Sequence, residues 1–389
     1  MPMTAQPEVV FDARWLRTGI GRYTLTLLSD LRNHLAGLSL TCIAQAADTE
    51  RLAPLCDRVV SFQSSIYTLS EQIVLPRIAR NAAVFCAPHY NLPILRTAPT
   101  IVTIHDLTHL VFPQYAHTLR ARLYAFPMLK AACARAARIA VPSGYTKQAL
   151  IEHLGADPEK IAVIPCAIDP VFHPLEKSHA AQIVKMIYGI AEPFLLCVTS
   201  TAPHKNLATL LEAHRSLRAK RAGIPRLVLV LPDSQPRIRP GSELLSLIQD
   251  PAVHCLHGVT DYGLSALYSA SLMTILPSFE EGFGYPVVES MACGTPVVCS
   301  SSASLPEVAG GCAELFSPTS SHELEDAIWH LLDSPTLRCD LAAKGLKRAV
   351  AFSTSPAASE YSTLVRSIIL DRSGARAQLP ALPDSLRDR

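Results

Sequence analysis

The sequence lacks several features that would place it in other classes of protein. Its 35 Lys and Arg nearly balance its 33 Asp and Glu, for a net charge of +2, so it offers no strong basic field for nucleic acid. No apolar run approaches the roughly 18 residues of a membrane-spanning helix. Its first residues show neither the basic nor the apolar region of a signal peptide. We therefore expect a cytoplasmic protein that is soluble or, at most, peripheral on the inner face of a membrane.

The sequence has no closely spaced pair of cysteines and few glycines. No Cys-x-x-Cys pair occurs among the eleven cysteines, which sit inside apolar runs such as Leu196-Cys197-Val198. We expect buried thiols in a reducing compartment rather than disulfides or zinc ligands. Glycine, at 17 of 389 residues, falls below its usual share of about 7%. The few places where glycines cluster are therefore informative.

Apolar side chains are abundant, at 49% of residues, and they fall in short runs that alternate with amphipathic stretches. The runs predict strands at 9–12, 40–44, 83–87, 100–104, 139–142 and 161–164, and then at 194–199, 227–231, 253–257, 273–276 and 296–300. The amphipathic stretches predict helices that include 23–35, 206–220, 262–270, 322–332 and 335–352. This alternation predicts an α/β protein with parallel sheets covered by helices on both faces.

A proline-rich segment divides the chain. Three prolines between residues 165 and 174 make a stiff, non-helical connector, and the length suits two domains of about 100–200 residues each. We therefore expect two Rossmann-like, doubly wound domains, 1–170 and 171–370. Such sheets bind ligands beyond the carboxyl ends of their strands, which predicts a site in a cleft where the two domains face each other. The segment 371–389 has little periodicity and is expected to be a disordered tail.

The most informative segment runs from residue 277 to residue 298. Gly282 and Gly284 follow an expected strand and allow the backbone to turn tightly beside a ligand. Pro286 suits the start of a helix and Gly294 its end. The order is then strand, glycine loop, short helix, strand. Such a loop directs backbone N–H groups and the positive end of the helix dipole at one spot, which suits a phosphate.

Two carboxylates flank this loop, and they carry a family resemblance. Glu281 lies on the loop and Glu289 one turn into the helix, with seven residues between them. Two solvated glutamates would be the plainer interpretation, but it leaves the surrounding glycines and prolines unexplained. The segment resembles the hallmark of the retaining glycosyltransferases of family 4, which have the two-domain GT-B architecture. Ser290 stands in place of the usual alanine.

The resemblance implies a role for each part of this segment. Glu281 would contact hydroxyls of the donor sugar, and Glu289 would hold the ribose of the nucleotide. The loop amides of Gly282, Phe283 and Gly284 would lie near the diphosphate and the sugar.

Other segments match the same family in the expected order. Gly19 and Gly21 precede the first helix and resemble the family's first glycine loop. Read alone, they could be a dinucleotide fingerprint, but Thr24 stands where its third glycine belongs. His105 ends an apolar strand and resembles the family's active-site histidine, which lies beside the donor sugar. The alternative for His105 is a histidine whose hydrogen bonds are satisfied by neighbouring backbone.

The second half opens with a segment that resembles the family's phosphate-binding turn. Lys205 matches the lysine that pairs with the donor phosphates, where a cation stabilises the leaving diphosphate; the alternative is a solvated residue at a helix start. His204 replaces the usual arginine, and Thr199 the usual glycine. A neutral imidazole is a weaker phosphate partner than a guanidinium. Val259 matches a position beside the nucleotide base, and a helix over 352–370 matches the one that crosses back to the first domain.

Together these matches predict a retaining glycosyltransferase in which His105, Lys205 and Glu281 are catalytic. A sugar would pass from a nucleotide-sugar donor to an acceptor hydroxyl without metal or other cofactor, since no Asp-x-Asp lies near the glycine loop. The segments around Gly21 and His105 resemble the mannosyltransferase-like branch, which favours GDP-mannose. The expected acceptor is a lipid-linked saccharide in polysaccharide or lipopolysaccharide assembly. Two alternatives stay open: a sugar-nucleotide epimerase of the same architecture, and a non-catalytic relative that binds nucleotide sugars.

Overall fold

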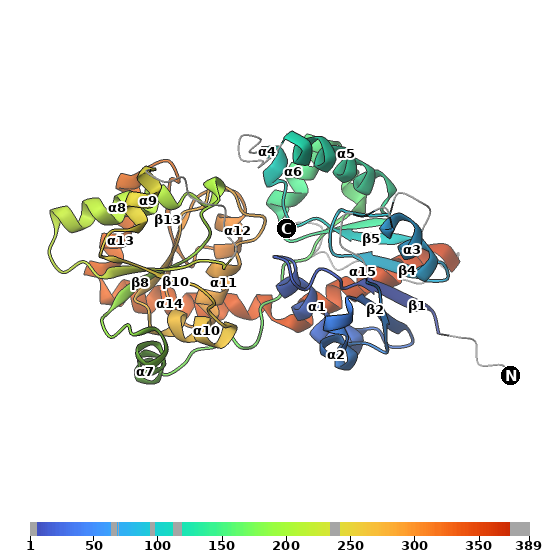
Figure 1. The fold of residues 1–389 in the computed structure, drawn as a ribbon, viewed down its shortest axis with the longest axis horizontal. Coiled ribbons are helices and arrows are strands. Elements are labelled where there is room, and N and C mark those ends of the chain that lie inside the picture. The colour runs from blue at the N-terminus through green and yellow to red at the C-terminus, as the bar shows by residue number, and fades with distance from the viewer. Residues whose placement is uncertain are drawn as a thin grey trace. The chain divides into compact units, whose positions relative to one another are not determined.

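The computed structural model describes residues 6–63, 68, 70–93, 98–111, 119–233 and 242–373. The chain forms two compact units, drawn in Figure 1: unit 1 comprises Met1–Asp169 and Ser353–Arg389, and unit 2 comprises Pro170–Phe352. Each unit is a parallel sheet flanked by helices, so the expected doubly wound α/β fold is confirmed. The first crossing between the units, after Asp169, falls inside the proline-rich segment.

Unit 1 contains a seven-stranded sheet in the order β3-β2-β1-β4-β5-β6-β7, in which all paired strands are parallel. The order reverses between β1 and β4, and such reversal points are where open α/β sheets bind ligands. The strands are β1 (Glu8–Asp12), β2 (Ser39–Ala44), β3 (Arg58–Ser61), β4 (Val84–Ala87), β5 (Thr100–Thr103), β6 (Arg138–Val141) and β7 (Ile161–Val163).

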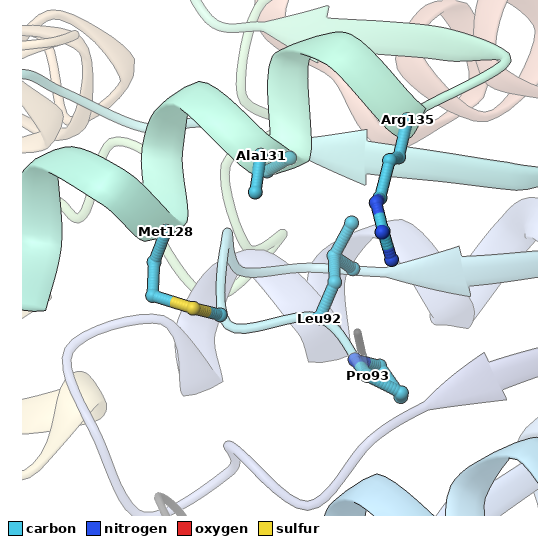
Figure 2. A pocket seen from close by; sticks show the side chains of 6 residues that line it. Leu92, Pro93, Met128, Ala131 and Arg135 are labelled. Atoms are coloured by element: carbon cyan, nitrogen blue, oxygen red, sulfur yellow. The ribbon is translucent and has the colours of Figure 1, made fainter. Parts of the chain in front are cut away.

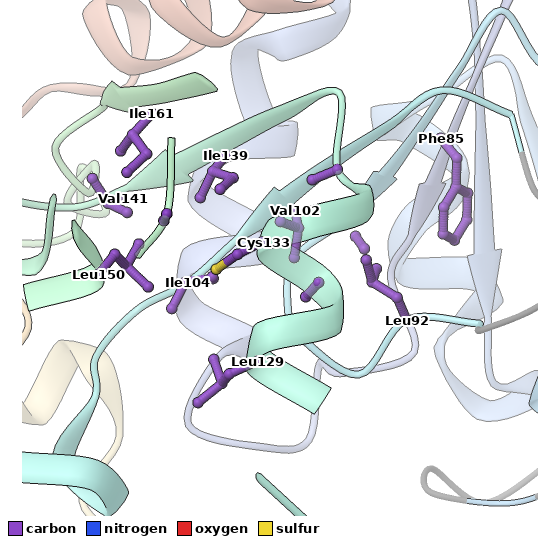
Figure 3. Packing of buried hydrophobic residues seen from close by; sticks show 14 of the residues in the cluster. Phe85, Leu92, Val102, Ile104, Leu129, Cys133, Ile139, Val141, Leu150 and Ile161 are labelled. Atoms are coloured by element: carbon purple, nitrogen blue, oxygen red, sulfur yellow. The ribbon is translucent and has the colours of Figure 1, made fainter. Parts of the chain in front are cut away.

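Helices cover both faces of this sheet because successive strand residues point to opposite sides. On one face, Val102 and Ile139 pack with residues of three helices in a hydrophobic cluster, part of which Figure 3 shows. On the other face, Phe11 packs against Tyr361 of the last helix. The helices of unit 1 are α1 (Gly21–His34), α2 (Thr49–Leu52), α3 (Glu71–Ile78), α4 (Thr108–Val111), α5 (Leu119–Arg135), α6 (Gly144–Leu154) and α15 (Thr354–Ser373).

The last helix, α15, belongs to unit 1 although unit 2 precedes it in the chain. It packs beside α1, where the Arg366 guanidinium donates to the carbonyl oxygens of His34 and Ala36. The helix runs to Ser373, through the first three residues of the tail expected at 371–389. The rest of that tail lies outside the described residues.

Unit 2 contains a six-stranded parallel sheet in the order β10-β9-β8-β11-β12-β13, which reverses between β8 and β11. Its strands are β8 (Phe194–Val198), β9 (Arg226–Val230), β10 (Val253–Leu256), β11 (Met273–Leu276), β12 (Val297–Ser300) and β13 (Glu314–Phe316). Its helices are α7 (Lys177–Tyr188), α8 (Leu207–Lys220), α9 (Glu243–Ile248), α10 (Asp261–Ala270), α11 (Tyr285–Ala292), α12 (Leu305–Ala309), α13 (Ser321–Asp333) and α14 (Pro335–Ala349).

Two edge strands, β3 and β13, are absent from the sequence-based expectation. In β3, Arg58 and Ser61 are exposed, and in β13 only Phe316 is buried. Neither strand contains the apolar run that marks a buried strand, so the alternation of apolar residues does not reveal them. The helix expected at 335–352 ends at Ala349 and is followed by one 3-10 turn.

The cysteines behave as small buried side chains, as expected. All eleven are free thiols, and most are buried. Within the described residues, no helix is both long and apolar enough to cross a membrane.

Candidate active site

The loops after β8 and β11 meet where the strand order of unit 2 reverses. The chain leaves β8 for the 3-10 turn Pro203–Lys205, and it leaves β11 for the glycine loop. The two loops are joined directly, because the Phe279 N–H donates to the His204 carbonyl oxygen at 2.8 Å. Two of the predicted site residues, His204 and Lys205, therefore lie against the predicted glycine loop.

Lys205 and Glu281 form an ion pair at this point. The Lys205 Nζ lies 2.8 Å from both carboxylate oxygens of Glu281. The Ser278 hydroxyl donates to Glu281 Oε1 at 2.7 Å. The lysine side chain is 24% exposed and the glutamate side chain 12% exposed, so both can meet a ligand. A cation for phosphates and an acceptor for sugar hydroxyls thus lie side by side.

Asn206 anchors the turn that presents Lys205, and the sequence analysis did not single it out. Its backbone is left-handed, with φ of 54°, a conformation that asparagine tolerates better than most residues. Its amide donates to the carbonyl oxygens of Pro277 at 2.9 Å and Pro318 at 2.7 Å. Asn206 therefore fastens the loop after β8 to the loops after β11 and β13. In the sequence, only its place directly before an expected helix could have pointed to this role.

The glycine loop starts α11 much as expected. Gly284 precedes the helix with φ of 96°, and an added Cβ would lie 2.5 Å from a Leu305 methyl carbon, so glycine is required there on two grounds. Gly294, with φ of 73°, follows the end of the helix. The Phe283 side chain is only 5% exposed and packs edge-on against Tyr285. Phe283 can therefore offer a ligand its backbone rather than its ring.

Three serines, one at the end of β12 and two after it, hold the carbonyl groups of the glycine loop. Ser300 donates to the carbonyl oxygen of residue 278, and Ser302 donates to that of residue 279 at 2.7 Å. Ser304 donates to the carbonyl oxygens of residues 281 and 283 at 2.8 and 3.1 Å. This alternating serine set was not recognised in the sequence. It fixes the loop backbone on the side of its carbonyl groups.

Glu289 lies on α11 as predicted, but it is buried. The residue is 1% exposed, and its Oε2 accepts a hydrogen bond from the Tyr268 hydroxyl at 2.9 Å. Val259 lies between β10 and α10, at the same carboxyl edge of the sheet. Its neighbour Gly258 has φ of 62°, which lets the chain turn there.

The predicted site residues of unit 1 lie at the carboxyl edge of its own sheet. His105 follows β5, and its Nε2 lies 2.9 Å from the Pro88 carbonyl oxygen. A carbonyl only accepts, so Nε2 carries a hydrogen, and in the neutral ring Nδ1 is then an acceptor. Burial lowers the pKa of His105, and the hydrogen bond to Pro88 opposes that shift. The Tyr23 ring packs edge-on against the imidazole, with centroids 4.6 Å apart.

Gly19 and Gly21 differ in what surrounds them. A Cβ on Gly21 would lie 1.9 Å from the Leu16 carbonyl oxygen, whereas a Cβ on Gly19 would meet nothing within 4 Å. Close packing of the protein's own backbone therefore explains Gly21. Gly19 has open space on the side where a side chain would project.

A buried ion-pair network supports this loop and was missed from the sequence. Arg14 is 1% exposed and contacts Asp12 through Nε and a terminal nitrogen, each at 2.8 Å. Its other terminal nitrogen lies 2.7 Å from Glu71, which also accepts from the Asn91 amide. Because Arg14 and Glu71 are 57 residues apart, local sequence gives no signal of this contact.

A small pocket in unit 1 does not coincide with the predicted site residues. It encloses about 10 Å³, which is room for about one water molecule. Figure 2 shows it beneath α5, and its lining residues are Leu92, Pro93, Met128, Ala131, Ala132 and Arg135. Its size excludes a sugar nucleotide.

Comparisons with known proteins agree with these observations. Among curated proteins, the chain is 27% identical to O-antigen chain mannosyltransferase B of Escherichia coli over 358 residues, which are 86% of this chain and 92% of that one. It is 34% identical to MMP alpha-(1->4)-mannosyltransferase of Mycolicibacterium hassiacum over 205 residues, which are 52% of this chain and 46% of that relative.

Solved structures share the fold. Sucrose-phosphate synthase from Thermosynechococcus elongatus superposes with a TM-score of 0.74 at 20% identity, covering 94% of this chain and 100% of that one. Anabaena HepE in complex with UDP-glucose superposes with a TM-score of 0.71 at 19% identity, covering 94% and 99% of the two chains.

Two family models match in succession along the chain. The model described as Glycosyltransferase Family 4 matches residues 17–172, and the model described as Glycosyl transferases group 1 matches residues 188–348. The first match covers β2 to β7 and most helices of unit 1, and the second covers the whole sheet and most helices of unit 2. With these matches, the mannosyltransferase relatives and the shared GT-B fold, the chain belongs to the glycosyltransferases of family 4.

Proposed function

We propose that this glycosyltransferase moves mannose from GDP-mannose to a hydroxyl of a lipid-linked saccharide in O-antigen-type polysaccharide assembly. The observation that carries the proposal is the meeting of Lys205 and Glu281 at the reversal point of unit 2, directly before α11. Both relatives described above are mannosyltransferases although their acceptors differ, which supports mannose. The O-antigen relative matches over most of its length, which supports a polysaccharide acceptor.

In the proposed reaction, the bond between sugar C1 and the leaving phosphate oxygen breaks while the acceptor oxygen bonds to C1 on the same face. The configuration is retained, and the leaving phosphate takes the acceptor's proton. Lys205 and the N–H groups that start α11 would stabilise the negative charge on the leaving diphosphate. Glu281 would accept from hydroxyls of the sugar and Glu289 from those of the ribose. Positioning and charge then carry catalysis.

We propose that the transfer step needs no metal. Lys205 provides positive charge where the diphosphate would lie, and among the described residues no group of three or more His, Cys, Asp or Glu side chains is placed to hold a metal ion. Activity should therefore persist in excess EDTA. Complete loss that manganese or magnesium restores would contradict this part of the proposal.

One screen tests the donor and separates the alternatives. The purified protein is incubated with GDP-mannose, UDP-glucose and ADP-glucose, and both binding and slow hydrolysis are measured. We expect GDP-mannose to bind most tightly and to release GDP. A new sugar nucleotide would indicate an epimerase, and binding without turnover in the presence of acceptor saccharides would indicate a non-catalytic protein. Preference for a uridine or adenosine sugar would overturn the choice of donor.

Peripheral contact with the inner face of the membrane forms part of the proposal, because a lipid-linked acceptor is presented there. The protein should float with vesicles that contain phosphatidylglycerol in a density gradient. Recovery of all protein away from the vesicles would contradict this contact while leaving the donor assignment unaffected.

A further inference from the structure

A buried tyrosine on α10 reaches the predicted ribose-binding glutamate on α11. The Tyr268 hydroxyl donates to Glu289 Oε2 at 2.9 Å, and the two residues are 0% and 1% exposed. They are 21 positions apart in the chain, so the fold rather than local sequence brings them together.

Tyr268 is itself held in place at both ends. Its carbonyl oxygen accepts hydrogen bonds from the hydroxyls of Thr295 at 2.6 Å and Ser271 at 2.9 Å. Its ring packs edge-on against Phe172, with centroids 6.0 Å apart and planes 72° apart. The phenol oxygen is therefore a fixed donor and not one that moves freely between partners.

A fixed neutral donor suits a carboxylate that must bind a ligand. A buried carboxylate is costly unless it is hydrogen-bonded. A lysine or arginine partner would neutralise it, whereas a phenol supports the charge without cancelling it. One hydrogen bond uses only one of about four acceptor positions on a carboxylate. The Tyr268 bond thus occupies one acceptor position on Oε2 and fixes the direction of the group.

From this geometry we propose that Tyr268 is a positioning residue of the transferase, whose hydroxyl aims the Glu289 carboxylate at the ribose of the donor nucleotide. The inference rests on the proposed function, in which Glu289 accepts hydrogen bonds from the ribose hydroxyls. It adds a residue on a neighbouring helix that determines how well those hydroxyls are recognised.

The test compares GDP with 2′,3′-dideoxy-GDP, which lacks both ribose hydroxyls. In Tyr268→Phe, the dissociation constant for GDP should rise by about tenfold, the loss expected for a hydrogen bond that supports a charged group, while that for dideoxy-GDP should stay within about twofold. The matched control is Tyr361→Phe, which removes the hydroxyl of another fully buried tyrosine and should leave both constants unchanged.

A double-mutant cycle with Glu289→Gln completes the test. Once Glu289 is replaced, Tyr268→Phe should add little further loss, because the two changes act through one interaction. The positioning role is wrong if the unaltered protein prefers GDP to dideoxy-GDP and Tyr268→Phe keeps that preference. It is also wrong if Tyr268→Phe weakens the binding of both nucleotides equally and lowers the melting temperature. If the unaltered protein binds neither guanosine nucleotide, the GDP-mannose proposal fails and this inference fails with it.

Discussion

The Lys205 ammonium contacts both carboxylate oxygens of Glu281, and each oxygen lies 2.8 Å from Nζ. Both residues are proposed to contact the donor. In this structure, each of the two charged groups instead binds the other. A sugar diphosphate brings the negative charge that would draw Lys205 away and leave Glu281 to the sugar hydroxyls. The Ser278 hydroxyl, at 2.7 Å from Glu281 Oε1, would hold the carboxylate in place during that exchange.

Replacing the lysine tests its proposed role. Lys205→Ala should lower kcat by about 10²–10³-fold, the range observed when one donor that stabilises a developing anion is removed. Steady-state kinetics and calorimetry with GDP would measure the effect. The control is Lys220→Ala. Lys220 also pairs with a glutamate, Glu325, but it lies at the end of α8 and not in the proposed site. Equal effects of the two substitutions would argue against a special role for Lys205.

The two glycines of the first loop should respond differently to the same substitution. Gly21→Ala places a Cβ 1.9 Å from the Leu16 carbonyl oxygen, and we expect a loss of about 1–3 kcal/mol or failure to fold, as for other overpacked sites. Gly19→Ala meets nothing within 4 Å and should change the stability by less than about 0.5 kcal/mol. Urea denaturation of both variants measures this.

Activity of the folded variant then tests the predicted ligand contact. Gly19→Ala should lower turnover if the open space beside Gly19 is used by the donor. A Gly19→Ala protein with full stability and full activity would remove Gly19 from the predicted site, whereas an equally stable Gly21→Ala protein would contradict the packing argument.

Ser290, which departs from the family motif, forms a hydrogen bond with a second hydroxyl group. The buried Ser290 hydroxyl donates to Thr274 Oγ1 at 2.8 Å, and Thr274 lies on the adjacent β11. Ser290→Ala should destabilise the protein by about 1–2 kcal/mol, because it leaves a buried hydroxyl without its partner. Ser290→Ala with Thr274→Val should recover much of that loss. Additive losses in urea denaturation would show that the two hydroxyls do not act as a pair.

The sequence predicted the parts of the fold and site that local chemistry determines. Buried strands can be recognised as apolar runs. The start and the end of α11 can be recognised because Gly284 and Gly294 adopt backbone conformations that few other residues tolerate. The contact of Lys205 with Glu281 was not visible, since it joins loops 76 residues apart. The supporting donors, such as Ser304 and Tyr268, depend on tertiary packing in the same way.

The roles carried over from the family remain predictions. The structure gives Lys205, His204 and the glycine loop a common location in unit 2, and it gives His105 and Gly21 a location at the carboxyl edge of unit 1. The geometry within each unit is compatible with the predicted contacts.

His105 should make the stability of the protein sensitive to acid. Burial lowers its pKa below the usual value near 6.5, so as the pH falls the unfolded chain takes up the proton first. The stabilisation is therefore complete above about pH 6.5 and is lost as the pH falls through the lower pKa of the folded state, by up to about 1.4 kcal/mol per pH unit. His214, whose ring bonds to the Pro225 carbonyl oxygen and whose pKa burial also lowers, contributes in the same direction.

Urea denaturation at pH 7.5, 6.5 and 5.5 measures this loss. His105→Gln should lose less free energy of unfolding between pH 7.5 and 5.5 than the unaltered protein, and His105→Gln with His214→Gln should lose least. The control is His322→Gln, the same exchange at a side chain that is 77% exposed. Turnover should fall only when the pH passes below the lowered pKa of the folded protein, since protonation converts the Nδ1 acceptor of His105 into a donor. If the unaltered protein and His105→Gln lose equal free energy on acidification, the His105 imidazole is not the group that titrates.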